Sequence, residues 1–204
     1  MPGDRSDCLT YEYRPRRLYV NLTNRCNNQC VFCARTRGEY RLGSFDLRLA
    51  RDHPPEDYVA AVEQRCAAGP RPLELVFCGY GEPTLRLPEL LEIARWAKDR
   101  ALPVRLNTNG QAELIHGSDV VSRLAGLIDR VNVSLNAPDE LSYVRTSCPQ
   151  AGGEAWGWVV GFLRRSVRYL PEAWASVVGH ALTAEEVSAS YQLAAFCGSR
   201  LRVR

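Results

Sequence analysis

The sequence lacks a long hydrophobic run. No stretch of its 204 residues approaches the roughly 18 consecutive apolar residues that a membrane-spanning helix needs. The first residues, MPGDRSDCLTYEYRPRR, also lack the order of charged, apolar and small residues that marks a secretory signal peptide. We therefore expect a cytoplasmic protein with no membrane partner.

A strong charge of either sign is also missing. The formal net charge is +3, from 26 Lys and Arg against 23 Asp and Glu. Nucleic-acid-binding domains usually carry a clear basic excess, so the composition indicates no nucleic-acid partner. The 46% hydrophobic content is typical of a folded globular chain. We expect residues 1–204 to form a single core domain, with residues 1–16 as an N-terminal lead-in.

Cysteine, in contrast, is abundant, with eight residues and no export signal. In a reducing compartment such residues are typical of thiols or metal ligands rather than of a disulfide framework. Three of them, Cys26, Cys30 and Cys33, stand on the spacing C-x-x-x-C-x-x-C. The other five are scattered, and a small, partly buried apolar role accounts for each: Cys8, Cys66, Cys78, Cys148 and Cys197.

Short apolar runs rich in β-branched residues alternate with longer amphipathic segments. The pattern predicts six strands buried on both faces, as in a parallel sheet, at residues 17–23, 73–79, 103–110, 130–138, 174–180 and 201–204. Helices are expected at 55–68, 87–100, 118–128, 154–170 and 183–197. Six strands are too few for a closed eight-stranded barrel. We therefore predict an α/β fold, a partial (βα)6 TIM-like barrel with one open side.

The cysteine triplet follows the first expected strand, at the carboxyl edge where α/β folds place their sites. A structural zinc site takes four ligands, usually as two pairs, and only one group of three is present. An iron–sulfur cluster held by three thiolates would keep one iron open to a further ligand. The alternative is that the three cysteines lie close together by coincidence and are buried thiols that bind no metal.

Polar residues and glycines follow the next three expected strands. In CGYGEPTL, Gly79 and Gly81 allow the backbone to approach a ligand closely, and Glu82 offers an anionic acceptor for an ammonium group. The segments LNTNG and SLNAP supply short side chains suited to bind a ribose or a carboxylate: Asn107, Asn109, Ser134 and Asn136. Each motif alone is also typical of a turn. Their place at successive strand ends favours a common site.

The cysteine spacing, with the aromatic Phe32 before the last cysteine, resembles the signature of the radical S-adenosylmethionine (SAM) enzymes. The segments NLTNRCNNQCVFC, VFCGYGEPTLRL, RLNTNG, LIHG and VSLNAPDELSY resemble in particular the small TatD-associated radical SAM proteins, over nearly the whole chain. The resemblance implies that Cys26, Cys30 and Cys33 bind a [4Fe-4S] cluster and are the catalytic and metal-binding residues. It also implies that SAM is reductively cleaved there to a 5′-deoxyadenosyl radical, which takes hydrogen from the substrate.

The same resemblance implies which residues bind SAM. The loop after the second strand would hold the SAM amino group, and the polar strand ends would hold its ribose and carboxylate. The region after the fifth strand, represented by Val178, would contact the adenine. The implied SAM-binding residues are Phe32, Gly79, Tyr80, Gly81, Glu82, Asn107, Asn109, Ser134, Asn136 and Val178.

Three functions are compatible with these motifs. The first is an oxidoreductase of the radical SAM class, acting on a small polar substrate and receiving electrons from a cellular reductant such as flavodoxin or ferredoxin. The second is an activase that generates a glycyl radical on a partner protein. The third, a non-catalytic iron–sulfur protein, would have no use for the GYGEP and LNTNG motifs. Arg35, Arg37 and Arg41 would pair with a substrate carboxylate or phosphate, or lie on a solvated loop.

Overall fold

A seven-stranded sheet organises the computed structural model, which describes residues 7–204. Its strand order is β1-β2-β5-β6-β7-β8-β9, so that the described strands leave it open between β1 and β9. The strands are β1 (Thr10–Arg14), β2 (Arg17–Val20), β5 (Glu74–Phe77), β6 (Val104–Thr108), β7 (Arg130–Ser134), β8 (Glu172–Val177) and β9 (Arg200–Val203). From β2 to β9 all neighbours are parallel. These six parallel strands are the ones that the sequence predicts.

Two β elements were not predicted. Strand β1 lies within the expected lead-in and pairs antiparallel with β2. A small hairpin joins β3 (Arg41–Leu42) to β4 (Phe45–Asp46) inside the long segment that follows the cysteines. The hairpin strands have two residues each, too few for a hydrophobic period. Strand β1, TYEYR, is polar apart from its tyrosines and lacks the apolar run of the buried strands.

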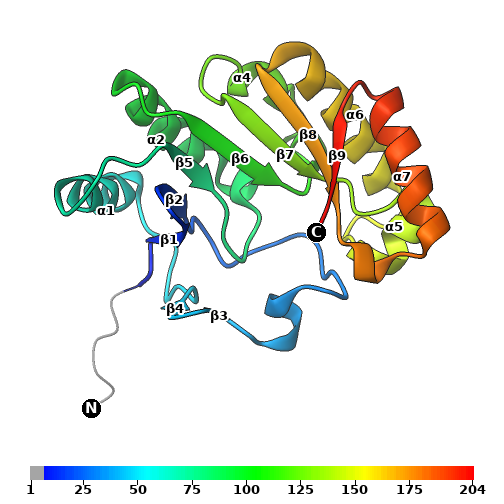
Figure 1. The fold of residues 1–204 in the computed structure, drawn as a ribbon, viewed down its shortest axis with the longest axis horizontal. Coiled ribbons are helices and arrows are strands. Elements are labelled where there is room, and N and C mark those ends of the chain that lie inside the picture. Colours follow the sequence, from blue (N-terminus) through cyan, green and yellow to red (C-terminus); the bar gives the residue numbers. More distant parts are fainter. Residues whose placement is uncertain (1–6) are drawn as a thin grey trace.

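The helices follow one another around the outside of the curved sheet (Figure 1). They are α1 (Pro55–Ala67), α2 (Leu87–Asp99), α3 (Ala112–His116), α4 (Val120–Leu124), α5 (Glu140–Ser147), α6 (Glu154–Tyr169) and α7 (Ala184–Phe196), with 3-10 turns η1 (Ala34–Arg37), η2 (Pro83–Arg86) and η3 (Gly179–Ala181). Four of the five predicted helices lie within two residues of their expected bounds, and the helix predicted at 118–128 is the shorter α4. Helices α3 and α5 were missed. Between residues 7 and 204 no helix has both the length and the apolarity to cross a membrane.

The two faces of the sheet differ in chemistry. In β6, Leu106 is fully buried, whereas Arg105 and Asn107 are half-buried on the opposite face. Strand β7 alternates in the same way, with Val131 and Val133 buried. The prediction that every strand is buried on both faces is therefore wrong for β6 and β7. Successive side chains point to opposite faces of a strand, and only the apolar set packs beneath the helices.

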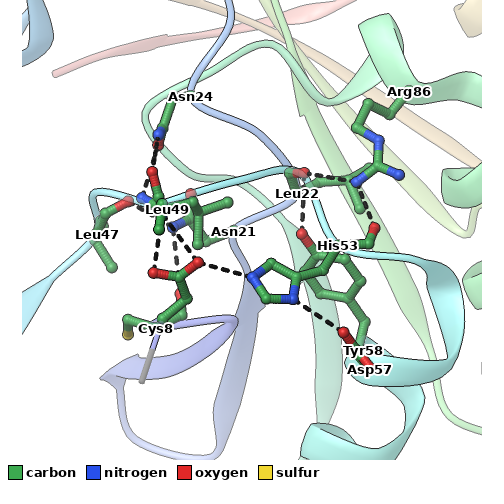
Figure 2. A network of polar contacts seen from close by, with 12 residues as sticks. Cys8, Asn21, Leu22, Asn24, Leu47, Leu49, His53, Asp57, Tyr58 and Arg86 are labelled. Carbon is green, nitrogen blue, oxygen red and sulfur yellow. Dashed lines mark hydrogen bonds and ion pairs between the residues drawn. The ribbon is translucent and has the colours of Figure 1, made fainter. Parts of the chain in front are cut away.

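A network of polar contacts fixes the long segment between β4 and α1 (Figure 2). His53 lies between two carboxylates, with Nε2 at 2.7 Å from Asp7 and Nδ1 at 2.9 Å from Asp57. The Asn21 amide donates to the carbonyl of Leu47 at 2.7 Å. These contacts join the start of the chain, the end of β2 and the start of α1.

This network predicts a pH-dependent stability. Burial lowers the pKa of His53, but its hydrogen bonds with Asp7 and Asp57 outweigh that effect and raise the pKa above its ordinary value. The folded state therefore favours protonated His53, and this contribution is lost as the pH rises through the raised pKa. We expect His53→Gln to lower the melting temperature more at about pH 6 than at about pH 9. Exposed His180→Gln is the control; an equal effect of His53→Gln at both values would contradict the prediction.

Candidate functional site

The cysteine loop begins directly after β2 and packs against the segment that follows α5. The amide of Gln29 donates to the carbonyl of Cys148 at 3.1 Å, and that of Val31 donates to the carbonyl of Thr146 at 3.0 Å. In return, the amide of Gln150 donates to the carbonyl of Asn27 at 2.9 Å. The loop is thus held by backbone hydrogen bonds to the unpredicted helix α5 and its exit.

The three thiols of this loop affect one another. Burial raises the pKa of Cys30 to about 12, and the nearby Cys26 and Cys33 raise it further. Burial, followed by the charge of Glu82, raises the pKa of Cys26 to about 11. Cys26 and Cys30 therefore resist ionisation unless a cation compensates the charge. The positive irons of a cluster would supply that compensation.

The three thiols on the loop are the donor type that an iron–sulfur cluster takes. A structural zinc site takes four ligands, and the motif offers three. The chemistry of the donor set therefore fits a [4Fe-4S] group.

A buried amide network connects the cysteine loop to the end of β6. The Asn109 amide donates to Asn27 Oδ1 at 2.7 Å, and the Asn27 amide donates to Gln111 Oε1 at 2.6 Å. Gln111 Nε2 then donates to Asn28 Oδ1 at 2.8 Å and to the Tyr143 hydroxyl at 2.9 Å. Asn109 thus braces the cysteine loop. Sequence reasoning missed Asn27, Asn28 and Gln111, and the only local signal was their place beside the motifs.

The glycines of the GYGEP loop are needed for packing between loops. A Cβ on Gly79 would collide with Asn21 Oδ1, and a Cβ on Gly81 would collide with the carbonyl oxygens of Thr23 and Arg25. The Gly81 amide donates to the Thr23 carbonyl at 3.0 Å, and the Glu82 amide donates to the Arg25 carbonyl at 2.8 Å. The loop therefore lies directly on the stretch that leads into Cys26.

Glu82 is held by hydrogen bonds from the protein. Its Oε1 accepts from the Thr84 amide at 3.0 Å and from the Thr84 and Thr108 hydroxyls at 2.7 Å each. Its Oε2 accepts from the Asn109 amide at 2.7 Å. The side chain is 3% exposed, and burial raises its pKa in spite of these donors. A carboxylate oxygen has two lone pairs, so Oε2, with one donor, keeps one for a further donor. Glu82 ties the GYGEP loop to the end of β6.

A cavity of about 550 Å³ opens on the concave face of the sheet. Of the predicted SAM-binding residues, Gly79, Tyr80 and Asn107 line it, together with Ala34 beside Cys33. Asn107 Oδ1 is buried without a hydrogen-bond partner. Because a buried polar atom is usually paired, this oxygen is a free acceptor for a ligand. The backbone and amide oxygens here fit the ammonium and hydroxyl donors of SAM.

The other predicted SAM-binding residues lie around this cavity without lining it. Ser134 ends β7 and accepts from Arg204 Nη2 at 3.4 Å. Asn136 has a φ of 62° and donates to the Ser147 hydroxyl at 3.1 Å, while its Oδ1 is buried without a partner. Val178 caps η3, and Phe32 is half-buried in the cysteine loop. Asn136 is connected to the cysteine loop through Ser147. The Ser147 side chain also hydrogen-bonds the Cys30 thiol, and this contact lowers the pKa of that thiol.

The arginines beside the cysteines have partners within the protein. Arg35 Nη2 donates to the Asn28 carbonyl at 2.5 Å, and Arg37 forms an ion pair of 3.2 Å with Glu39. Arg41 begins β3 and is exposed. Of the three, Arg35 stabilises the cysteine loop. The positions of these side chains therefore give no support to the expectation that they pair with a substrate carboxylate or phosphate.

Together these features define a class of protein. An open α/β barrel has a three-thiol loop at its first parallel strand end, and a ligand-sized cavity follows along the next strands. This is the architecture of a cofactor-dependent enzyme. The model of the radical SAM superfamily matches residues 20–194, and the chain belongs to the radical SAM superfamily. The enzymes of this family use a [4Fe-4S] cluster and SAM.

Relatives support the family and differ in activity. A protein named as a probable GTP 3′,8-cyclase from Thermococcus kodakarensis is 31% identical over 153 residues, which are 75% of this chain and 44% of that protein. A protein from Methanocaldococcus jannaschii, named as a glycyl-radical enzyme activating enzyme, is 28% identical over 51% of this chain and 38% of its own. The chain thus spans less than half the length of these two curated relatives.

A solved structure supports the fold. SuiB of Streptococcus suis bound to its precursor peptide SuiA has a TM-score of 0.70 at 18% identity, over 93% of this chain and 39% of that chain. The same protein bound to SAM gives a TM-score of 0.65 at 18% identity, over 91% of this chain and 37% of that chain. The predicted partial barrel is therefore confirmed.

Proposed function

We propose that Cys26, Cys30 and Cys33 hold the [4Fe-4S] cluster, and that the chain cleaves SAM reductively and abstracts hydrogen from a small polar substrate. One observation carries the proposal. The three thiols share one loop, and Ala34, beside Cys33, lines the 550 Å³ cavity that Gly79, Tyr80 and Asn107 also line. Burial, followed by the charge of the nearby Cys33, raises the pKa of Tyr80. The two side chains therefore interact electrostatically.

When bound and reduced, the cluster supplies the electron that converts SAM to the 5′-deoxyadenosyl radical. The residues of the chain bind and orient. Asn107 would accept a hydrogen bond from SAM through its unpaired Oδ1, and Gly79 and Tyr80, which line the cavity, would hold the SAM ammonium group. Glu82, Asn109 and the amides of the cysteine loop keep these acceptors in place.

An anaerobic assay tests this proposal. The protein is reconstituted with iron and sulfide, reduced with dithionite and given SAM, and 5′-deoxyadenosine is measured by mass spectrometry. SAM binding is measured in parallel, so that a missing substrate does not hide the cofactor site. We expect the product or, without substrate, tight SAM binding to the reduced protein. A cluster-loaded protein that neither binds nor cleaves SAM would contradict the proposal.

An activase is the second candidate, because the Methanocaldococcus jannaschii relative carries that name. In that case the radical would be passed to a glycine of a partner protein, and a glycyl-radical partner would increase SAM cleavage. A small substrate is favoured because the cavity has the size of a small-molecule site.

Further parts of the proposal concern the setting of the enzyme. All eight cysteines are free thiols, which supports a reducing compartment, and we place the protein in the cytoplasm. It would act as an oxidoreductase supplied with electrons by flavodoxin or ferredoxin. Electron transfer from either reduced protein to the cluster would be the direct check.

A further inference from the structure

Cys30 of the cysteine loop lies opposite Ser147, the last residue of α5. The amides on either side of Cys30 donate to the carbonyls on either side of Ser147: Gln29 to Cys148 at 3.1 Å and Val31 to Thr146 at 3.0 Å. This pairing continues the antiparallel bridge between Asn28 and Pro149. In an antiparallel pairing the residues between two such bonds stand directly opposite each other. The backbone thus brings the Ser147 side chain to the Cys30 thiol.

The Ser147 hydroxyl is fully buried among polar groups. Its Oγ accepts from Asn136 Nδ2 at 3.1 Å. The Tyr143 hydroxyl and the Cys30 thiol are its other hydrogen-bonding neighbours. A hydroxyl has one proton and two lone pairs, so it can donate to only one of its neighbours.

Two side-chain amides determine which way the Tyr143 hydroxyl points. Gln111 Nε2 donates to it at 2.9 Å, and Asn28 Nδ2 donates to it at 3.3 Å. An amide NH₂ group donates and does not accept, so these two groups occupy the lone pairs of the Tyr143 oxygen. The Tyr143 proton is left for its remaining partner, Ser147. All of these side chains are buried, so water does not compete for the bonds.

The direction of the Ser147 proton follows from these contacts. Asn136 and Tyr143 both donate to Ser147 Oγ and fill its two lone pairs. The single Ser147 proton is therefore directed to Cys30 Sγ. A hydrogen bond to an ionised group is stronger than one to a neutral group, so the thiolate is the better acceptor. Hydrogen bonds to the sulfurs of an iron–sulfur cluster are among the features that set its reduction potential.

We infer that Ser147 is a positioning residue, whose hydroxyl donates to the sulfur of Cys30 and raises the reduction potential of the cluster held there. The inference rests on the proposed function, because Cys30 has to bind the cluster. Reduction adds one negative charge to the cluster, and a donor at a ligand sulfur favours the more negative form. Asn136 and Tyr143 fix the direction of the donor. The cluster then accepts an electron from a weaker reductant than it otherwise would.

A redox titration of the reconstituted protein tests the inference. The midpoint potential of the cluster is measured anaerobically and without SAM, by visible absorbance and electron paramagnetic resonance. We expect Ser147→Ala to shift the one-electron reduction equilibrium about tenfold, which lowers the midpoint potential by about 59 mV. Ser147→Thr keeps the hydroxyl and should keep the wild-type potential. Ser166→Ala is the matched control, because Ser166 is also a fully buried helical serine but belongs to α6.

Iron content and circular dichroism of each variant are measured before the titration. Equal potentials in loaded wild type and loaded Ser147→Ala overturn the inference. An equal shift in Ser166→Ala also overturns it, because any buried serine would then have the same effect. If Ser147→Ala holds no cluster, Ser147→Thr decides: a wild-type potential supports the inference and a lowered one overturns it. A wild-type protein that binds no [4Fe-4S] cluster overturns the proposed function as well, whereas unchanged potentials in loaded variants leave the proposed function standing.

Discussion

Cys30→Ala is expected to abolish the cluster and all SAM cleavage. Cys30 is the middle thiol of the loop and is electrostatically close to both Cys26 and Cys33. Two remaining thiolates bind only two irons of a four-iron cluster, and solvent then competes for the others. Iron and sulfide content, visible absorbance and 5′-deoxyadenosine formation should all fall to background. The loop itself should persist, because its contacts to residues 146–150 use backbone atoms.

Cys66→Ala provides the matched control. Cys66 is a half-buried free thiol on α1, remote in sequence from the loop, and packs against the hydrophobic core. This variant should retain the wild-type iron content and product yield. Circular dichroism of both variants separates cluster loss from unfolding. Full iron content and SAM cleavage in Cys30→Ala would refute the cluster assignment.

Gly81→Ala is expected to destabilise the protein by about 3 kcal/mol and to reduce cluster retention with it. The new methyl group would collide with the carbonyl oxygens of Thr23 and Arg25, which are backbone atoms with no side-chain freedom. Relief requires the stretch before Cys26 to move, and this breaks the hydrogen bonds at 3.0 and 2.8 Å that join the two loops. Chemical denaturation and iron content measure the two effects.

Gly157→Ala is the comparison for this effect. Gly157 is exposed within α6, and a Cβ there has no neighbour within 4 Å. Alanine forms helices better than glycine, so this variant should gain roughly 0.5–1 kcal/mol. If both variants changed stability alike, close packing of the GYGEP loop would not be the reason for its glycine.

The parallel strands and the long helices could be predicted because their signals are local. Segment 87–100 has apolar residues at helical spacing, and α2 follows it almost to the residue. Helix α5 could not be predicted in this way. Its N-cap, Asp139, which accepts from the Ser142 amide, is a local signal, but much of the role of the helix lies in contacts with the distant cysteine loop.

Of the residues that the motifs single out, Gly79, Tyr80 and Asn107 line one cavity. The contacts within the site could not be read from the sequence. The bracing role of Glu82 depends on Thr108, which lies 26 residues away, and that of Gln111 depends on Asn28, which lies 83 residues away. Hydrogen bonds over such separations leave no local pattern. The arginines that line the cavity also escaped notice, because they come from different strands and are brought to one cavity only in the folded sheet.

The arginines of β9 also bear on self-association of the protein. Strand β9 is an edge of the described sheet and presents one side to no other strand. Unpaired backbone groups on such an edge can recruit the same strand of another copy. Arg200 and Arg202 are exposed there, and two such edges approaching each other would bring like charges together. Arg200 and Arg202 thus disfavour pairing of this edge with the same edge of a second molecule.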